Sequence, residues 1–208
     1  GNYVFTKDIK INVDPEGNKL VAGPWLYTFS SGIFSGYNQQ NVNVDLNGHS
    51  MDLNIATDQS TTGIAAVGAT GKVEIFNAGA MSVKAVSNEG AQTAALFVNG
   101  GGQLYIHNGG ENLEKKVLTV RGSTTNSTNG AVIKSMNGAN GERSGLKVDG
   151  LIDLEADTTD GVGMAEGLSA VASTIDVGGG RIIMTKAGQN PGLNFGGGGG
   201  KGAFRSFC

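Results

Sequence analysis

The sequence predicts an all-β protein: a right-handed parallel β-helix of about five three-stranded coils with an N-terminal cap. Three observations predict this fold class. Glycine is abundant, at 36 of 208 residues, against a typical usage of about 7 %. Many short segments alternate apolar and polar residues, which is the period of a β-strand. Equivalent segments also recur about every 30 residues, as they do in repeat architectures.

The composition excludes several other classes of protein. Only three prolines are present and glycine has no three-residue period, which excludes collagen. A single cysteine, Cys208, excludes a disulfide scaffold. An apolar content of 38 % and a net charge of -3 argue against a charged disordered chain. Helical bundles are disfavoured because a glycine inside a helix costs about 1 kcal/mol relative to alanine.

Charge and hydropathy limit the partners that we expect. Acidic residues outnumber basic ones by 18 to 15, whereas proteins that read nucleic acid carry clustered Lys and Arg. We therefore expect no nucleic-acid partner. The apolar runs are far shorter than the roughly 18 residues of a membrane-spanning helix, so we expect no membrane insertion by this segment. The start at Gly1 has no secretory signal pattern and is interpreted as a mature or trimmed end.

The first segment of the repeat unit is an alternating strand that runs into a glycine-containing corner. Residues 42–46 alternate apolar and polar side chains and then meet Asn47 and Gly48. Such corners need a positive φ, which Gly or Asn adopts at little cost. Copies of this segment begin at Val42, Val73, Leu104, Leu146 and Ile175. Corner glycines are expected at Gly48, Gly79 and Gly109.

Two further segments complete each unit. Copies of the second segment are residues 51–55, 81–85, 151–154 and 182–184. Copies of the third segment, which is small and apolar, are residues 64–68, 94–98, 131–133 and 168–172. Polar turns at 57–63, 87–93 and 122–130 are expected between the second and third segments. The 42-residue interval between Leu104 and Leu146 is explained by insertions at 122–130 and 137–143.

Stacking of equivalent strands gives each segment an inner and an outer face. Strands one coil apart pair at about 4.8 Å, so equivalent side chains form columns. The inward positions are Val42, Val44, Leu46, Val73, Ile75, Leu104 and Ile106, and the outward positions are Asn43, Asp45, Glu74 and Tyr105. A β-propeller is the alternative repeat fold, but its blades have four strands and carry WD or kelch signatures that are absent here.

The two ends of the chain depart from the repeat, which occupies residues 37–190. Residues 1–36 are predicted to be cap strands that cover the first coil, because an open β-helix end is prone to aggregation. An aromatic binding site at Trp25, Tyr27 and Phe29 is the alternative. Residues 191–208 are predicted to be a Gly-rich linker or tail. Phe204 and Phe207 could dock on the last coil or on a neighbouring chain. Cys208 belongs to a tag, marks a truncation, or is a thiol that pairs with another chain.

Three features together carry a resemblance to a known family. They are the opening residues 3–9, the coils that begin at Val42, Val73 and Leu104, and the Asn-Gly and Ala-Gly corners. In these features the chain resembles the N-terminal part of the passenger region of a bacterial type V autotransporter adhesin. The resemblance implies a non-catalytic fragment of a longer passenger. It also implies export across the outer membrane, an extracellular location at the bacterial cell surface, and a role in adhesion and virulence.

Binding is predicted to use the outer face and the protruding turns. The partner would be a host or bacterial surface protein or glycan, or a second copy of the chain. The turns at 57–63, 87–93, 122–130 and 137–143 are rich in Ser, Thr and Asn. The candidate adhesion residues in them are Asp58, Ser60, Asn88, Glu89, Thr125, Asn126, Asn140 and Arg143. A carbohydrate-active β-helix enzyme (lyase or glycosidase) and a self-assembling extracellular filament subunit remain the alternatives.

Catalytic, metal and cofactor sites are not expected. Glycoside cleavage needs two carboxylates at a set separation, and the candidates are Asp153, Glu155, Asp157, Asp160 and Asp176. Asp153 and Glu155 occupy polar positions of one alternating strand, so a solvated outer face explains them. His49 and His107 are the only histidines and could lie two coils apart, which is a weak basis for a metal site. No nucleophile elbow, P-loop or Cys/His ligand set is present.

Overall fold

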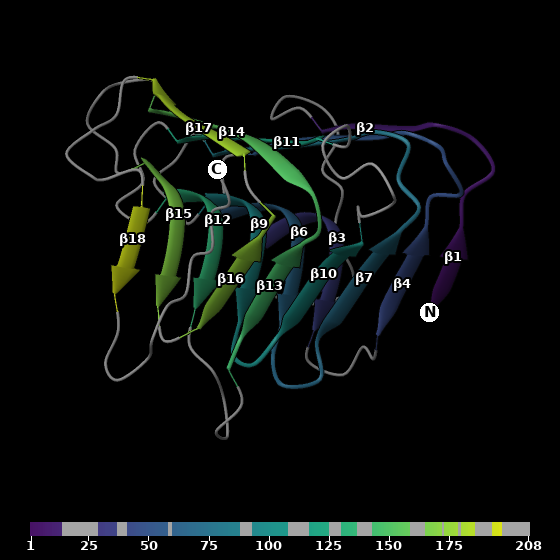
Figure 1. The fold of residues 1–208 in the computed structure, drawn as a ribbon, viewed down its shortest axis with the longest axis horizontal. Helices are drawn as coiled ribbons and strands as arrows, with labels where there is room; N and C mark the ends of the chain where they lie inside the picture. The colour runs from purple at the N-terminus through teal and green to yellow at the C-terminus, as the bar shows by residue number, and fades with distance from the viewer. Residues whose placement is uncertain are drawn as a thin grey trace.

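The computed structural model describes residues 1–13, 29–36, 41–57, 60–87, 93–107, 117–124, 130–136, 143–158, 165–171, 173–178, 180–185 and 193–196. In these residues the chain forms strands and turns and no helix, which confirms the all-β prediction (Figure 1). The strands lie in three parallel sheets of six strands each. This arrangement is consistent with a β-helix.

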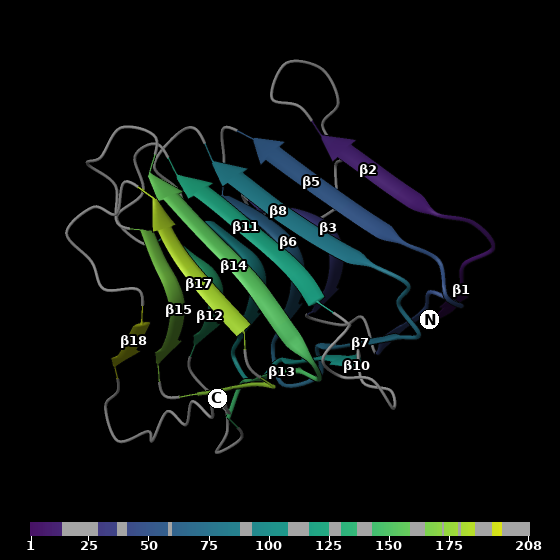
Figure 2. The same ribbon diagram turned by 45° about the horizontal axis from the view of Figure 1, so that its top comes forward.

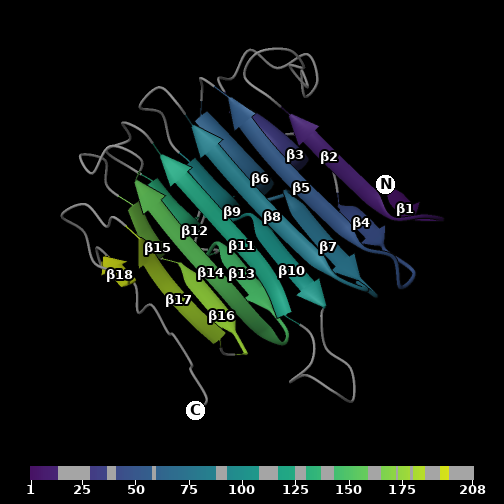
Figure 3. The ribbon, with the colours of Figure 1, turned by 90° about the horizontal axis from the view of Figure 1, so that it is seen from above.

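Each sheet collects every third strand of the chain. Sheet A contains β1 (Asn2–Val4), β4 (Val42–Asp45), β7 (Lys72–Phe76), β10 (Gln103–His107), β13 (Gly145–Val148) and β16 (Thr174–Val177). Sheet B contains β2 (Ile9–Val13), β5 (Met51–Thr57), β8 (Met81–Ser87), β11 (Val117–Thr124), β14 (Leu151–Thr158) and β17 (Gly180–Thr185). Sheet C contains β3 (Phe29–Gly36), β6 (Ser60–Val67), β9 (Thr93–Asn99), β12 (Gly130–Met136), β15 (Ala165–Val171) and β18 (Leu193–Gly196). Figures 2 and 3 show the strands of sheet B side by side in this order.

The strand register confirms the repeat that the sequence predicts in sheet A. Val42 pairs with Val73, Val73 with Leu104, Leu104 with Leu146, and Leu146 with Ile175, always in parallel. In sheet B, Met51 pairs with Met81, which is also the pairing that the repeat predicts. In sheet C the aligned column is Ile64, Leu96, Ile133 and Leu168. The repeat intervals therefore correspond to one passage of the chain through all three sheets.

The insertion predicted at residues 122–130 is wrong. Met81 pairs with Leu118 and Leu96 with Ile133, so the 15 residues from Met81 to Leu96 are matched by 15 from Leu118 to Ile133. The first insertion instead lies between β10 and β11, because Leu104 and Leu118 are 14 positions apart whereas their partners Val73 and Met81 are 8 apart. β11 itself is a second-segment strand that the sequence analysis did not name. The insertion predicted at 137–143 is confirmed, because the chain from Ile133 to Leu146 exceeds its equivalent in the preceding unit.

The apolar core fills the space between the three sheets. Val44, Ile75, Ile106, Val148 and Val177 form one buried column in sheet A. Columns from sheets B and C join the same cluster, through residues such as Leu53, Val83, Leu96 and Ile133. The inward positions that the sequence predicts in sheet A are confirmed as buried, except that Val42 is only partly buried. Each strand buries every second side chain, which explains why apolar and polar residues alternate along it.

Sheet C has a repeated irregularity in its strand pairing. The pairing of β6 with β9 skips one position, between Thr62 opposite Ala94 and Ile64 opposite Leu96. The same skip occurs in the pairings of β3 with β6 and of β12 with β15. A Cβ at Gly63 would collide with the Val83 side chain and the Ala95 carbonyl. Glycine is required there because the backbone approaches sheet B.

The corners after β4 and β7 confirm part of the glycine prediction. Asn47 and Gly48 have φ of 49° and 80°, as expected for a tight corner. At the next corner the positive φ falls on Asn77, at 52°, and not on Gly79. Gly79 is required for a different reason, because a Cβ there would collide with the Gly48 carbonyl of the neighbouring corner. Gly109 lies outside the described residues.

Both ends of the chain contribute strands to the same three sheets. β1, β2 and β3 are the first strands of sheets A, B and C, and a capping role for residues 1–36 stays a prediction. Trp25 and Tyr27 lie outside the described residues, so the alternative of an aromatic site there also stays a prediction. β18 falls in the range predicted to be linker or tail, and it pairs with β15. Residues 197–208 lie outside the described residues.

Candidate functional site

The outer face of sheet A carries a row of polar and aromatic side chains in register. Because strands one unit apart pair directly, side chains at equivalent positions become neighbours along the stack. The central row is Asn2, Asn43, Glu74, Tyr105, Lys147 and Asp176. Phe76 and His107 form part of the next row. We call Lys72, Glu74, Phe76, Tyr105, His107, Lys147 and Asp149 the sheet A ladder.

Glu74 connects two strands of the ladder. Its Oε2 lies 2.9 Å from Lys72 Nζ, and its Oε1 lies 3.3 Å from His107 Nε2. Burial alone would raise the pKa of Glu74, but the hydrogen bonds and charges of Lys72 and His107 outweigh it, and the net pKa is lowered. Glu74 is therefore held as a carboxylate at neutral pH. Its two oxygens are directed at protein groups on β7 and β10.

An aromatic stack runs along the axis of the ladder. The Phe76 and His107 rings are stacked, with centroids 4.2 Å apart and an interplanar angle of 15°. The Tyr105 ring lies against His107, with centroids 3.4 Å apart. Lys147 Nζ lies 4.5 Å from the centroid of Tyr105, in cation–π range. Each of the three rings thus lies against another ring, and Tyr105 also lies against an ammonium group.

Tyr105, Lys147 and Asp149 form a hydrogen-bonded group at the end of this stack. The Tyr105 hydroxyl donates to Asp149 Oδ2 at 2.5 Å and accepts from Lys147 Nζ at 3.1 Å. Lys147 Nζ also lies 3.3 Å from Asp149 Oδ1. The bond to Asp149 raises the pKa of Tyr105, and the bond to Tyr105 followed by that to Asp149 raises the pKa of Lys147. Tyr105 stays neutral and Lys147 stays charged at neutral pH.

Asparagine and aspartate side chains continue the face toward the N-terminal strands. Asn43 Nδ2 donates to Asn2 Oδ1 at 2.8 Å. Asp45 Oδ1 accepts from the Asn47 backbone N–H at 2.8 Å and from Asn77 Nδ2 at 3.0 Å. These bonds join neighbouring strands and hold the corners that carry positive φ. The outer face is therefore cross-linked by side chains over several strands.

Three ionisable groups of the ladder have pKa values that are shifted away from neutral pH. A general acid or base works best when its pKa lies near the working pH. In the ladder the pKa of Glu74 is lowered, and those of Tyr105 and Lys147 are raised. Each shift moves the pKa of its group further from pH 7. The arrangement fixes a pattern of charges and hydrogen-bonding groups on the outer face of sheet A.

Two of the eight predicted adhesion residues fall within the described chain. Ser60 begins β6, so the turn predicted at 57–63 is shorter than expected and Ser60 belongs to a strand. Arg143 is exposed just before β13, and its carbonyl accepts a hydrogen bond of 2.7 Å from Gln103 Nε2. Arg143 thus borders the outer face of sheet A. Those outside the described residues are Asp58, Asn88, Glu89, Thr125, Asn126 and Asn140.

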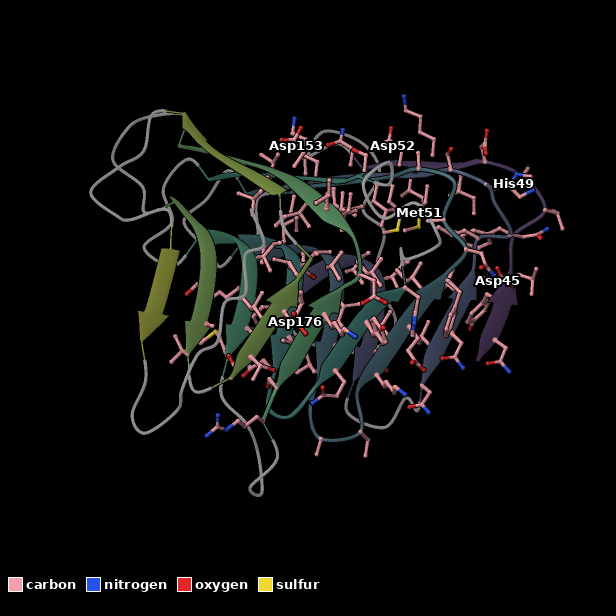
Figure 4. The ribbon with its side chains drawn as sticks, viewed as in Figure 1. Asp45, His49, Met51, Asp52, Asp153 and Asp176 are labelled. Atoms are coloured by element: carbon pink, nitrogen blue, oxygen red, sulfur yellow. The ribbon has the colours of Figure 1, made fainter. Side chains whose placement is uncertain are left out.

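The carboxylates weighed for catalysis are distributed over two sheets. Asp153 lies on the outer face of sheet B and Asp176 on that of sheet A (Figure 4). On either side of Asp153, Ile152 and Leu154 are buried, which confirms the prediction of an outer-face position for Asp153. The side chains of Glu155 and Asp157, and all of Asp160, lie outside the described part.

The two histidines make separate contacts. His49 Nδ1 lies 3.6 Å from Asp8 Oδ1, whereas His107 contacts Glu74, Phe76 and Tyr105. Within the described residues, no group of three or more His, Cys, Asp and Glu side chains could hold a metal ion.

The sequence analysis found the outward positions of Glu74 and Tyr105 but not the ladder that they build. The signal was present in the repeat alignment, because the match of Val73, Leu104 and Leu146 also aligns the residues that follow each of them. That alignment places Glu74, Tyr105 and Lys147 in one row. The stacking of His107 needs side-chain geometry that no alignment supplies.

Comparisons with known proteins do not identify a relative of this chain. No protein-family model, curated protein or solved structure matches it. In the part of the chain that is described, there is also no helix that could span a membrane.

Proposed function

We propose that this chain is a non-catalytic adhesin fragment that binds its partner through the outer face of sheet A. The observation that carries the proposal is the sheet A ladder. Ion pairs and hydrogen bonds join its side chains, and they present acidic, basic and hydroxyl groups on one sheet. Rigid display of such groups reduces the ordering entropy that a binding surface loses on association.

The fold that we propose for this function is the right-handed parallel β-helix of about five coils beyond a capped N-terminus. The support is that consecutive strands fall in different sheets and every third strand pairs in parallel. A right-handed connection is the rule for parallel strands. Within this proposal the chain is part of an autotransporter-like passenger at the bacterial cell surface. The opening residues 3–9 and the corner pattern support that interpretation.

The partner that suits this face is a polar surface protein or glycan. Lys72 and Lys147 are the two lysines of the ladder, and their side chains are 41 % and 47 % exposed. Asp176 is exposed in the row beyond Lys147. The aromatic rings are stacked on one another, so recognition would rest on hydrogen bonds and charges rather than on ring stacking. Such contacts give specificity more than affinity.

The test measures binding of the fluorescently labelled chain to bacterial and host epithelial cells. A double variant, Lys72→Ala with Lys147→Ala, removes both lysines of the ladder. The matched control, Lys10→Ala with Lys84→Ala, removes the same charge from two exposed positions on sheet B. We expect the ladder variant to lose most of the binding and the control to retain it. Equal binding by both variants, or no binding by the unaltered chain, contradicts the proposal.

A further inference from the structure

Two serine hydroxyls are buried inside the stack without a protein partner. Among the described residues, three buried side-chain atoms have no hydrogen-bond partner: Asn43 Oδ1, Ser135 Oγ and Ser173 Oγ. Asn43 lies on the outer face of sheet A, whereas Ser135 and Ser173 are both 0 % exposed. A buried hydroxyl that makes no hydrogen bond costs free energy, and folded proteins leave few such groups unpaired. The two serine hydroxyls therefore need a partner.

Sheets A and C meet at a junction that recurs along the stack. Each sheet A strand begins beside the sheet C strand that lies four strands earlier in the chain. The Lys72 N–H of β7 donates to Ser35 Oγ of β3 at 3.1 Å. A Cβ at Gly102, just before β10, would collide with the Ala66 carbonyl of β6. β13 likewise contacts β9. The same spacing places the start of β16 beside β12.

Ser135 and Ser173 occupy equivalent positions at the last of these junctions. The aligned positions of sheet C are Ser35, Ala66, Val98 and Ser135. The residues just before the aligned sheet A strands are Gly71, Gly102, Ser144 and Ser173. Gly102 meets Ala66 two steps earlier in both columns, so Ser173 meets Ser135. The two unpaired hydroxyls thus belong to one site.

The partner of Ser144 shows what Ser173 has lost. Ser144 Oγ accepts at 2.9 Å from the Gly101 N–H, in the turn between β9 and β10. That turn runs from residue 99 to residue 103, which is four positions, whereas the equivalent stretch from 136 to 145 spans nine. The group equivalent to the Gly101 N–H lies in this longer stretch. The insertion therefore accounts for the missing bond to Ser173.

Ser135 lacks its partner for a related reason. At the first junction, Ser35 is served by the Lys72 N–H. The equivalent group at the last junction is the Thr174 N–H, because Thr174 aligns with Lys72 through β10 and β13. The Thr174 N–H donates instead to the Ser144 carbonyl, at 3.0 Å. Ser135 Oγ is thus left to bond to something other than the start of β16.

We infer that Ser135 and Ser173 together bind a buried water molecule where β12 meets the start of β16. A hydroxyl both donates and accepts, so the pair supplies the two or more partners that a buried water needs. The neighbours of Ser135 in its column are Val98 and Ala170, which are buried and uncharged. An ion would be far more costly to bury than water among such groups.

The small side chains at this level leave room for the water. Ser135 and Ala170 are both smaller than Val98, the aligned residue of β9. Strand pairing keeps these strands about 4.8 Å apart, so the strands cannot close the space that the smaller side chains leave. The inference does not depend on the proposed adhesin function.

A high-resolution crystal structure of the unaltered chain tests the site directly. We expect one ordered water oxygen within about 3.2 Å of both Ser135 Oγ and Ser173 Oγ, and we expect that water to be lost in crystals of Ser173→Ala. A direct hydrogen bond between the two hydroxyls, bonds from them to other protein groups, or two separate waters would each overturn the inference.

Urea unfolding provides an independent test with Ser135→Ala, Ser173→Ala and the double variant. Each single change should raise the unfolding equilibrium constant about threefold to tenfold. The double variant should raise it by less than the product of the two, because both changes remove the same water. Ser82→Ala, on the outer face of sheet B, is the control and should change it less than twofold.

The opposite outcomes are equally clear. A hydroxyl that is truly unpaired costs stability, so its removal would leave the unfolding constant unchanged or lower it. Either result for Ser135→Ala or Ser173→Ala refutes the water site, as do effects of the two changes that simply multiply. If a variant does not fold, the crystal structure of the unaltered chain decides the question.

Discussion

Ile75 and Glu74 are adjacent residues of β7 that face opposite sides of sheet A, and truncating each tests how the stack is stabilised. Ile75 is fully buried between Val44 and Ile106 in the core column. Ile75→Ala removes three carbon atoms, worth roughly 2.4 kcal/mol at about 0.8 kcal/mol for each buried methylene. The backbone ladder holds the neighbouring strands about 4.8 Å apart, so the cavity cannot collapse fully. We expect a total cost of about 3 to 4 kcal/mol.

The assay for this prediction is urea unfolding followed by circular dichroism. Glu74→Ala is the matched control on the same strand, and we expect it to cost about 1 kcal/mol or less, because a partly exposed ion pair contributes little. If Ile75→Ala costs less than about 1 kcal/mol, or no more than Glu74→Ala, then the core between the sheets does not determine stability. That result would refute the assignment of inner and outer faces.

Two further predictions concern one glycine and one carboxylate. Gly102→Ala is expected to destabilise the chain by about 1 to 3 kcal/mol in urea unfolding, because its Cβ would meet the Ala66 carbonyl. An alanine Cβ at Gly48 would meet no atom within 4 Å, so Gly48→Ala should cost only the strain of a φ of 80°, about 1 to 2 kcal/mol. The folded pKa of Glu74 is lowered from 4.5, so its contribution is present above pH 4.5 and is lost as pH falls through the lower folded value. Glu74→Gln should reduce the loss in the free energy of unfolding as pH falls below 4.5. A variant that loses as much stability as the unaltered chain over this range would contradict a stabilising role for the Glu74 carboxylate.

The repeat could be predicted from sequence because identical geometry imposes similar residues at each passage of the chain. Val42, Val73 and Leu104 are separated by equal intervals and pair as expected. The alternation around each of them identified the buried side. The prediction failed at β11, because residues 117–124 end in polar and small residues that resemble a turn. Pairing with both β8 and β14 makes this segment a strand.

The candidate site was only partly predictable. The outward positions of Glu74 and Tyr105 followed from alternation, whereas the turns were expected to carry the binding residues. The structure brings side chains from different units together on a sheet face, at distances set by strand pairing. Residues 33 positions apart, such as Glu74 and His107, become hydrogen-bonded neighbours. Local sequence does not encode such contacts, because they depend on the register of non-consecutive strands.

By itself the sequence determined that the chain is all β, where most strands lie and which of their faces is apolar. These features follow from local composition and from the two-residue period of a strand. The tertiary structure alone decided where the insertions of the third unit lie and which outer side chains interact. The physical reason is that strands of this chain pair across intervals of about 30 to 40 residues. Which side chains become neighbours depends on the register between strands that are distant in the sequence, and a local pattern does not determine that register.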